Sequence, residues 1–222
     1  MYSFFKRLLD LVIATMASLI LLPLLLPIVV LLRFTAEGEV FYLQERIGYK
    51  NSKFKIWKFA TMLKNSLDIG TGSITLENDF RVTKFGKFLR KTKINELPQL
   101  INILLGDMSV VGPRPVMFVS FKSYPKNIQN IIYNVKPGLT GIGSIVFRDE
   151  EHYLAHHDDP MKFYREHIIP YKSDLELWFV ENNTLCSYFK IIFVTAWVVV
   201  FPSSNIVGRV FEGIPSLPES LN

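Results

Sequence analysis

Four short stretches of the sequence contain side chains that could act on a phosphorylated substrate. They cover residues 44–48 (QERIG), 95–100 (NELPQL), 106–115 (GDMSVVGPRP) and 136–141 (KPGLTG). Phosphoryl transfer needs cations that neutralise phosphate charge and groups that hold the reactants in place, rather than elaborate covalent machinery. The stretches combine carboxylates, cations and glycine-rich turns, so they are the first candidates for such chemistry.

Glu96 lies at the start of the strongest helix pattern in the chain, residues 95–105. Apolar residues recur there at the helical spacing i, i+3, i+4, i+7, namely Leu97, Leu100, Ile101 and Leu104. A carboxylate in the first turn can hold a metal ion that bridges phosphate oxygens. The free N–H groups of the same turn favour a bound anion. A carboxylate in the first turn also stabilises a helix simply through the helix dipole. Glu96 is therefore either a metal ligand or a structural residue, and both explanations stay open.

Arg114 lies between Pro113 and Pro115, in a turn that fixes the direction of its guanidinium. The forked N–H groups of arginine suit bidentate binding of phosphate. A structural ion pair with a carboxylate is the alternative. Gly112 and Gly138 either let the backbone approach a ligand closely or serve turn geometry alone.

Basic residues recur every three positions between the first and second stretches and form a basic stripe: Arg81, Lys84, Lys87 and Arg90. At that spacing the four side chains share roughly one side of a helix. They form either a solvated face or, beside a membrane, a surface for anionic lipid headgroups.

The N-terminal run of residues 8–32 is apolar enough and long enough to cross a bilayer, and Asp10 is its only charge. Pro23 and Pro27 each remove a backbone donor within the run. Basic residues flank both ends, so the charge rule gives no clear crossing direction. We therefore favour a bent, re-entrant helix that enters and leaves by the same face, broken at Pro23 and Pro27, over a spanning helix.

The remaining sequence predicts a small hairpin and several helices. Residues 40–46 and 54–62 are typical of paired strands, and residues 66–78 of a loop. Residues 188–201 are apolar on nearly every face but too short to span, so they are core or interfacial. The predicted divisions are a membrane helix at 1–33, a catalytic domain at 34–201 and an extended tail at 202–222.

Composition narrows the function classes. Hydrophobic residues make up 49% of the chain and the net charge is +5, which suits anionic lipid, phosphorylated substrates or nucleic acid. No nucleic-acid-binding motif is present, and an apolar hairpin would be a strange addition to such a protein, so we expect no nucleic-acid partner. Cys186 is the single cysteine, which excludes an internal disulfide and favours a reducing compartment.

In their order and spacing, the four stretches, the apolar run and residues 79–83 (DFRVT) closely resemble the bacterial sugar transferase family of monotopic phosphoglycosyl transferases. The resemblance covers about residues 6–197. It implies a nucleotide-sugar donor, usually a UDP-sugar, a polyprenyl-phosphate acceptor and Mg²⁺. It places the protein in a bacterial cytoplasmic membrane with its catalytic domain on the cytoplasmic face, at an initiating step of surface glycan synthesis.

The fold implied is α+β: a mostly helical cytosolic domain with a small β-hairpin, a re-entrant N-terminal helix and a C-terminal interfacial helix. The resemblance also implies a two-step reaction, in which an aspartate attacks the β-phosphate of the donor and the lipid phosphate then takes the phosphosugar. Positions 95 and 96 would be catalytic, with Glu96 holding the metal. The substrate-binding positions would be Arg81, Arg90, Gln99, Gly112, Pro113, Arg114 and Gly138. Assembly as a homo-oligomer is left open.

This sequence departs from the family at two positions. Leu22 precedes Pro23 where the family usually has serine, whose hydroxyl would satisfy a backbone group freed by the proline. Asn95 stands where the family has its nucleophilic aspartate, and an amide is a poor nucleophile toward phosphate.

Three explanations of Asn95 stay open. It is a substitution introduced at an aspartate, or a native residue whose role passes to another carboxylate such as Glu96 or Asp107. The third explanation is a non-catalytic, membrane-anchored homologue that binds nucleotide-sugar. Because the other site residues are present, we favour an enzyme.

Overall fold

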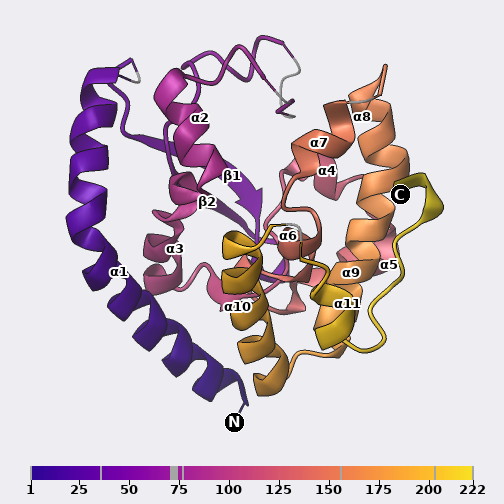
Figure 1. The fold of residues 1–222 in the computed structure, drawn as a ribbon. Helices are drawn as coiled ribbons and strands as arrows, with labels where there is room; N and C mark the ends of the chain where they lie inside the picture. Colours follow the sequence, from indigo (N-terminus) through magenta and orange to yellow (C-terminus); the bar gives the residue numbers. More distant parts are fainter. Residues whose placement is uncertain are drawn as a thin grey trace.

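The computed structural model of the chain describes residues 2–35, 37–70, 75–76, 78–155, 157–202 and 204–221. The fold is mostly helical with small sheets, as the sequence predicts (Figure 1). Helix α1 (Tyr2–Thr35) runs along one edge of the molecule, and helix α9 (Ile169–Glu181) lies on the opposite side.

The other elements lie between these two helices or pack around α9 (Figure 1). The strands are β1 (Phe41–Ile47), β2 (Lys53–Phe59), β3 (Ser109–Val111) and β4 (Gly138–Thr140). The other helices of the described chain are α2 (Lys84–Lys91), α3 (Gln99–Leu105), α4 (Phe118–Phe121), α5 (Lys126–Gln129), α6 (Ile142–Val146), α7 (Glu150–Ala155), α8 (Pro160–Phe163), α10 (Leu185–Val200) and α11 (Val207–Val210).

The predicted hairpin is confirmed. Strands β1 and β2 pair antiparallel, with Phe41 opposite Phe59 and Ile47 opposite Lys53. Asn102 of α3 docks on the free edge of β2: its Oδ1 accepts from the Trp57 N–H at 2.9 Å and its Nδ2 donates to the Lys55 carbonyl at 2.8 Å. A single buried amide thereby satisfies the strand edge and fixes α3 against the hairpin.

The second sheet was not predicted. Strands β3 and β4 pair in parallel, with Ser109 opposite Gly138. The two glycines flanking this pairing serve close approach of one backbone to another: a Cβ on Gly138 would lie 2.1 Å from the Gly112 nitrogen, and a Cβ on Gly112 would lie 2.3 Å from the Lys136 carbonyl oxygen. Any side chain at either position would therefore separate the strands.

The helix predicted at 95–105 is divided. Ile94–Glu96 form a 3-10 turn, and α3 begins only at Gln99. Pro98 has no N–H to donate to Ile94, and the Leu97 N–H takes that carbonyl instead at 3.1 Å. Glu96 itself donates its N–H to Lys93, at 3.1 Å. The N–H groups of Glu96 and Leu97 are therefore bonded within the turn, and neither is free for the anion that the sequence predicts there.

Helix α1 stays helical through Pro23 and Pro27 and changes direction near its middle (Figure 1). Among the described helices it is the one long and apolar enough to cross a membrane. Most of its side chains are exposed, whereas Ala14, Ile28 and Leu32 are buried against the body. The apolar helix is confirmed, and its re-entrant course stays a prediction.

Both ends of α1 are fixed to the same body. Near the N-terminus, buried Asp10 accepts from the Val110 N–H and the Tyr188 hydroxyl, each at 2.9 Å. Arg7 donates to the last carbonyls of α3, those of Ile103 at 2.6 Å and Leu104 at 3.1 Å. Near the C-terminus, Ile28 and Leu32 pack with Phe59 and Leu89.

Helix α10 presents one face to the core and one face outward. Thr184 caps its N-terminus through the Ser187 N–H. Its buried residues are Tyr188, Ile191, Val194 and Val198, and its large exposed residues are Leu185, Phe189, Phe193, Trp197, Val199 and Val200.

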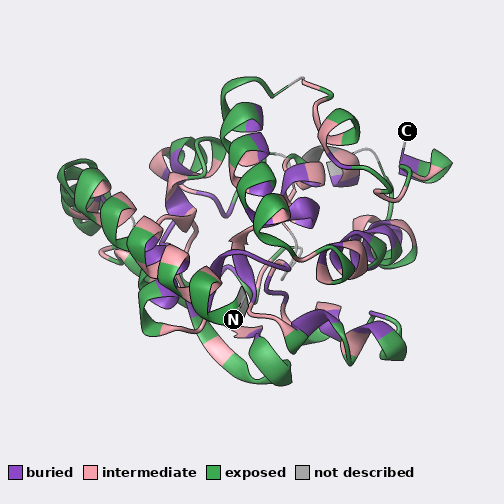
Figure 2. Cartoon of the chain, turned by 90° about the horizontal axis from the view of Figure 1, so that it is seen from below, coloured by how far each residue is buried: buried purple, intermediate pink, exposed green. Residues whose placement is uncertain are grey.

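Helix α1 is also largely exposed. Viewed from below, exposed stretches follow α1 (Figure 2).

Two other predictions are settled in the described residues. Residues 66–70 of the predicted loop form turns and a bend, while residues 71–74 and 77 lie outside the described chain. The predicted extended tail is only partly extended, because it includes α11 and a 3-10 turn at Glu219–Leu221. Phe211 and Leu221 are buried in the main core, and this packing folds the tail back onto the domain.

Candidate functional site

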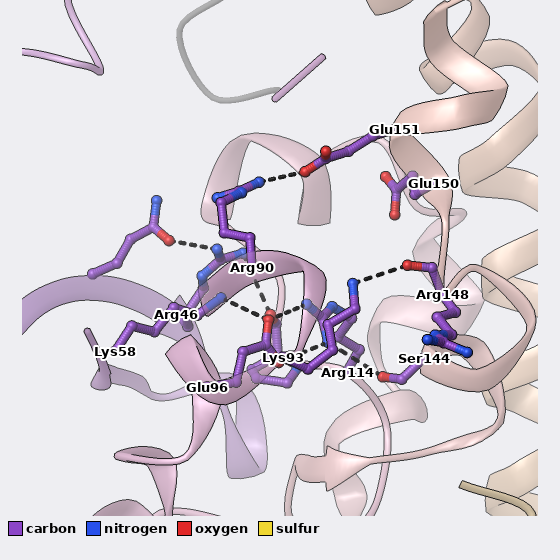
Figure 3. A network of polar contacts seen from close by, with 12 residues as sticks. Arg46, Lys58, Arg90, Lys93, Glu96, Arg114, Ser144, Arg148, Glu150 and Glu151 are labelled. Atoms are coloured by element: carbon purple, nitrogen blue, oxygen red, sulfur yellow. Dashed lines mark hydrogen bonds and ion pairs between the residues drawn. The ribbon is translucent and has the colours of Figure 1, made fainter. Parts of the chain in front are cut away.

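An open cavity of about 1870 Å³ lies between the hairpin, α2, the turn at residues 93–97 and the segment from α6 to α10. Charged side chains converge on its wall from all of these elements (Figure 3). The basic ones include Arg46, Lys58, Lys87, Arg90, Lys93, Arg114, Arg148, Arg165 and Lys172. A cavity with such a wall attracts an anion with several negative charges.

Glu96 is the centre of the polar network in Figure 3. Arg114 donates from Nη2 to Glu96 Oε1 at 3.0 Å and from Nη1 to Oε2 at 3.5 Å. Lys58 Nζ lies 3.2 Å from the same Oε1. The Glu96 side chain is only 16% exposed, against 37% for Arg114. Arg114 therefore remains accessible from the cavity while its partner is largely covered.

The charges of this group reinforce one another. Burial by itself opposes ionisation of Glu96, but the charges of Arg114 and Lys58 outweigh it and hold the pKa of Glu96 well below its usual range. The Glu96 charge in turn raises the pKa of Arg114. Burial lowers the pKa of Lys58 to about 8, although the Glu96 charge opposes that shift. Glu96 is therefore a carboxylate throughout the neutral range.

Arg46 adds a further cation beside this group. Its Nη1 lies 3.4 Å from the Pro115 carbonyl oxygen, and its Nη2 donates to Gln44 Oε1. Its Nε is buried and has no hydrogen-bond partner. Burial lowers the pKa of Arg46 to about 10, and the nearby Arg114 charge contributes to that shift. An anion in the cavity would relieve this crowding of positive charge.

The opposite wall carries a second set of cations. Arg90 of α2 pairs with Glu151 of α7, and Lys93 donates to the Arg148 carbonyl at 3.0 Å. Arg148 donates to the Val198 carbonyl of α10. Through Arg148, this wall of the cavity contacts α10, the helix predicted to lie at the membrane surface.

Asn95 also lines the cavity. It is 6% exposed, and its side-chain oxygen Oδ1 is buried without a hydrogen-bond partner. A buried amide oxygen without a partner is costly, which is consistent with a ligand at this position. The amide lies directly before Glu96 in the 3-10 turn, so the two side chains leave one short segment of backbone.

The structure brings Arg90, Asn95, Glu96 and Arg114 to the cavity wall. Gln99 is buried behind the wall in a small pocket with Arg46, Lys58 and Arg114, and its Nε2 has no hydrogen-bond partner. Three other predicted site residues are buried and contribute backbone rather than side chains: Gly112, Pro113 and Gly138. Gly112 and Pro113 directly precede Arg114, and the Gly138 N–H donates to the Pro113 carbonyl.

Arg81 lies elsewhere. It precedes α2, is 1% exposed and does not line the cavity. Its Nη2 lies 2.6 Å from Asp79 Oδ2, and its Nη1 donates to the Ser66 carbonyl at 2.7 Å. The basic stripe is thus divided, because the helix that would align its four members begins only at Lys84. Arg81 therefore stabilises the loop that contains Ser66 and Ile69, and the predicted contact between Arg81 and substrate is not supported.

Sequence reasoning assigned no role to Lys58 or Arg46. Arg46 stands in one of the four chemical stretches, and alternation along the hairpin would have placed it on one face with Gln44. Lys58 follows Trp57 in an aromatic strand and gave no such signal. Asp107, considered as a replacement nucleophile, accepts from Asn102 Nδ2 at 3.3 Å and does not line the cavity.

The oxygen atoms near Glu96 can be compared with the Mg²⁺ site that the family resemblance implies. In the described part of the chain no three His, Cys, Asp or Glu side chains gather closely enough to hold a metal by themselves. Asn95 and Glu96 are consecutive residues that both line the cavity, and the Asn95 Oδ1 has no hydrogen-bond partner. Mg²⁺ commonly takes one or two protein oxygens and completes its shell with substrate phosphates and water.

Comparison with known proteins gives a consistent result. Residues 1–202 match the model of a family described as bacterial sugar transferase. The chain is 36% identical, over 80% of its length and 41% of the relative's, to UDP-N-acetylgalactosamine-undecaprenyl-phosphate N-acetylgalactosaminephosphotransferase of Aeromonas hydrophila. It is 41% identical, over 64% of its length and 30% of the relative's, to UDP-glucose:undecaprenyl-phosphate glucose-1-phosphate transferase of Klebsiella pneumoniae.

A shorter relative is covered more fully. The exopolysaccharide production protein ExoY of Rhizobium meliloti is 38% identical over 68% of this chain and 72% of its own length. The chain spans well under half the length of the first two relatives.

Proposed function

Because this chain belongs to the bacterial sugar transferase family, we propose that it transfers a sugar-1-phosphate from a UDP-sugar to a polyprenyl phosphate, with release of UMP. The observation that carries the proposal is the group formed by Glu96, Arg114 and Lys58 at the wall of a basic cavity. The names of the relatives support a UDP-sugar donor and an undecaprenyl-phosphate acceptor. The reaction would initiate synthesis of a surface glycan.

The cations of the wall perform most of the work in this proposal. Arg114 and Arg46 face the position that a donor diphosphate would take, and they neutralise charge that builds up on the leaving UMP. Glu96 aims the Arg114 guanidinium through its two hydrogen bonds. Because that geometry exists before substrate arrives, little reorganisation is needed during the reaction.

We also propose that the reaction uses Mg²⁺, held by Glu96 and the Asn95 amide oxygen together with phosphate oxygens. When bound, the ion supplies additional neutralisation of phosphate charge. The buried, unpartnered Asn95 Oδ1 supports this assignment.

Asn95 limits the two-step form of the reaction. An aspartate at this position could attack the β-phosphorus and form an acyl phosphate with the phosphosugar, while the bond to UMP breaks and UMP leaves. An amide cannot act in the same way. Glu96 is the nearest carboxylate in the sequence, but both of its oxygens accept from Arg114. Glu151 and Glu150 are paired with Arg90 and Lys172. Because the family resemblance implies an aspartate nucleophile at this position, we infer that position 95 is where the nucleophile of this site belongs.

We propose that α1 is re-entrant and that α10 lies at the membrane surface. The same body contacts α1 near Asp10 and again near Leu32, which a straight span between two aqueous sides would not allow. The exposed apolar side chains of α1 and α10 provide the lipid-facing surface. Lys6, Arg7 and Arg33 at the two ends favour the cytoplasmic face.

Thiol labelling in intact cells tests this topology. Single cysteines at Ser3 and Ser220, with Cys186 changed to Ser, should both resist a membrane-impermeant reagent. Labelling of one site alone would mean that α1 spans the membrane. Labelling of both would place the domain on the outer face.

UMP release tests the transfer reaction. The purified protein and its Asn95→Asp variant, each in lipid nanodiscs with undecaprenyl phosphate, would be compared for UMP release from a panel of UDP-sugars. We expect at least one UDP-sugar to release UMP, and release to be much faster with Asn95→Asp. Arg114→Ala serves as the control that lacks the donor site. Binding of UDP-sugars without UMP release, by both this chain and Asn95→Asp, would instead identify a binding protein.

A further inference from the structure

The main chain of Arg114 is held from both sides. In the sequence Pro113–Arg114–Pro115 neither proline has an N–H, so Arg114 carries the one backbone donor of the three residues. That N–H donates to Glu176 Oε1 of α9 at 3.1 Å. The Arg114 carbonyl accepts from the Tyr133 hydroxyl at 2.7 Å. The origin of the Arg114 side chain is therefore set by two buried residues outside the cavity.

Glu176 also sets the position of the neighbouring helix α6. A Cβ on Gly143 would lie 2.4 Å from Glu176 Oε1, so α6 approaches this closely only because residue 143 is glycine. The next residue, Ser144, lies on the cavity wall with its Oγ 3.4 Å from Arg114 Nη1. One carboxylate thus fixes both the backbone of Arg114 and the wall that its guanidinium faces.

The surroundings of Glu176 oppose ionisation of its carboxyl group. It is 2% exposed, and its second oxygen, Oε2, is buried without a hydrogen-bond partner. Lys172 precedes it by one turn of α9, but the Lys172 ammonium pairs with Glu150. Tyr124 and Tyr133 are the other titratable groups that interact with it, besides Arg114.

Burial raises the pKa of Glu176 to about 7, and the Arg114 N–H and the Lys172 charge offset part of that effect. A carboxylate accepts a hydrogen bond more strongly than a neutral acid. Glu176 therefore holds the Arg114 backbone more firmly once it has lost its proton.

We propose that Glu176 is a positioning residue for the transfer reaction, which aims the Arg114 guanidinium at the donor diphosphate by holding the Arg114 main chain. The proposal rests on the proposed function. Glu176 does not line the cavity and acts only through Arg114 and α6. It belongs to neither the four chemical stretches nor the predicted site.

Three variants test this role: Glu176→Ala, which removes the acceptor, Glu176→Gln, which keeps an acceptor oxygen without charge, and Glu181→Gln, an exposed carboxylate change on the same helix. Affinity for UDP and for inorganic pyrophosphate, and kcat and KM for the donor, would be measured from pH 5.5 to 8.5. Thermal unfolding of each variant shows whether it is folded.

We expect Glu176→Ala to raise Kd for both probes and KM by about tenfold, the effect of one lost buried hydrogen bond. Glu176→Gln should stay within about threefold of wild type at pH 6, since both then carry a neutral side chain. The wild-type kcat/KM should rise with pH around a midpoint near 7. That rise should vanish in Glu176→Gln and persist in Glu181→Gln.

Equal pH profiles in wild type and Glu176→Gln would overturn the proposal, as would wild-type affinity in folded Glu176→Ala. If Glu176→Ala does not fold, the comparison with Glu176→Gln decides alone. Binding of both probes requires no turnover. A protein that shows the expected binding series but releases no UMP would refute the proposed function and leave Glu176 in its role. Failure of wild type to bind either probe would refute both.

Discussion

Two arginine–carboxylate pairs in this protein use the same chemistry for different ends. Arg81 and Asp79 are almost completely buried, and Arg81 also bonds the carbonyls of the loop before it. Arg114 and Glu96 also form an ion pair, but the guanidinium of Arg114 is 37% exposed on the wall of a cavity with several other cations. We call Arg81–Asp79 the closed pair and Arg114–Glu96 the open pair. The closed pair stabilises the fold, whereas the arginine of the open pair, with other cations nearby, can release its carboxylate and bind a substrate phosphate.

The largest expected effect concerns Asn95, the residue next to the open pair. Asn95→Asp should raise transfer by a factor on the order of 10³ or more, because loss of a nucleophile commonly costs at least that much. The measurement is UMP release with polyprenyl phosphate, together with intact mass after incubation with donor. We expect a phosphosugar adduct on Asn95→Asp and none on the unaltered chain.

Full activity of the unaltered chain without gain in Asn95→Asp would place the nucleophile elsewhere. Glu96→Gln would then be the next variant to measure.

Breaking the closed pair should affect stability alone. Arg81→Ala would leave Asp79 buried without its cation, which costs about 3–5 kcal/mol in the free energy of unfolding. Chemical denaturation in detergent measures that loss, and the exposed neighbour Lys84→Ala is the control. At a temperature where the variant is folded, its donor KM should equal that of wild type. A raised KM with unchanged stability would return Arg81 to the substrate site.

A third carboxylate, Glu176, has neither a paired cation nor access to solvent, and its effect should depend on pH. Its pKa is raised to about 7 in the folded state. Between roughly its usual pKa of 4.5 and 7, the folded protein retains a proton that the unfolded chain releases. The free energy of unfolding should therefore fall as pH rises through this window, by at most about 3.4 kcal/mol.

Glu176→Gln should lack that part of the slope, and Glu181→Gln should keep it. Unfolding midpoints at pH 5, 6, 7 and 8 provide the comparison. An identical slope in Glu176→Gln and wild type would show that Glu176 is ionised throughout.

Breaking the open pair should affect binding more than stability. Arg114→Ala should weaken donor binding by about 1.5–3 kcal/mol, or about 10- to 150-fold, the contribution of a charge-assisted hydrogen bond. Isothermal titration with UDP measures the change, and Arg209→Ala is the control for loss of an exposed positive charge. Unchanged affinity in a folded Arg114→Ala protein would remove Arg114 from the donor site.

The elements predicted correctly are those with a repeated local pattern. The apolar run of α1 and the strand patterns of β1 and β2 can each be recognised within a few residues. Strands β3 and β4 have three residues each, too few for a period to show, and they pair across an intervening segment of 26 residues, 112–137. Their pairing depends on two glycines that matter only once the strands are adjacent.

The sequence by itself determined the residue types of the site, because Asn95, Glu96 and Arg114 stand in short motifs whose order indicates the family. The tertiary structure alone decided which cations surround them. Lys58 comes from a strand and Glu176 from a distant helix, and their roles follow from distances of 3.2 Å to Glu96 and 3.1 Å to the Arg114 nitrogen. Charge acts through space and burial rather than along the chain, so partners and exposure cannot be taken from residue types.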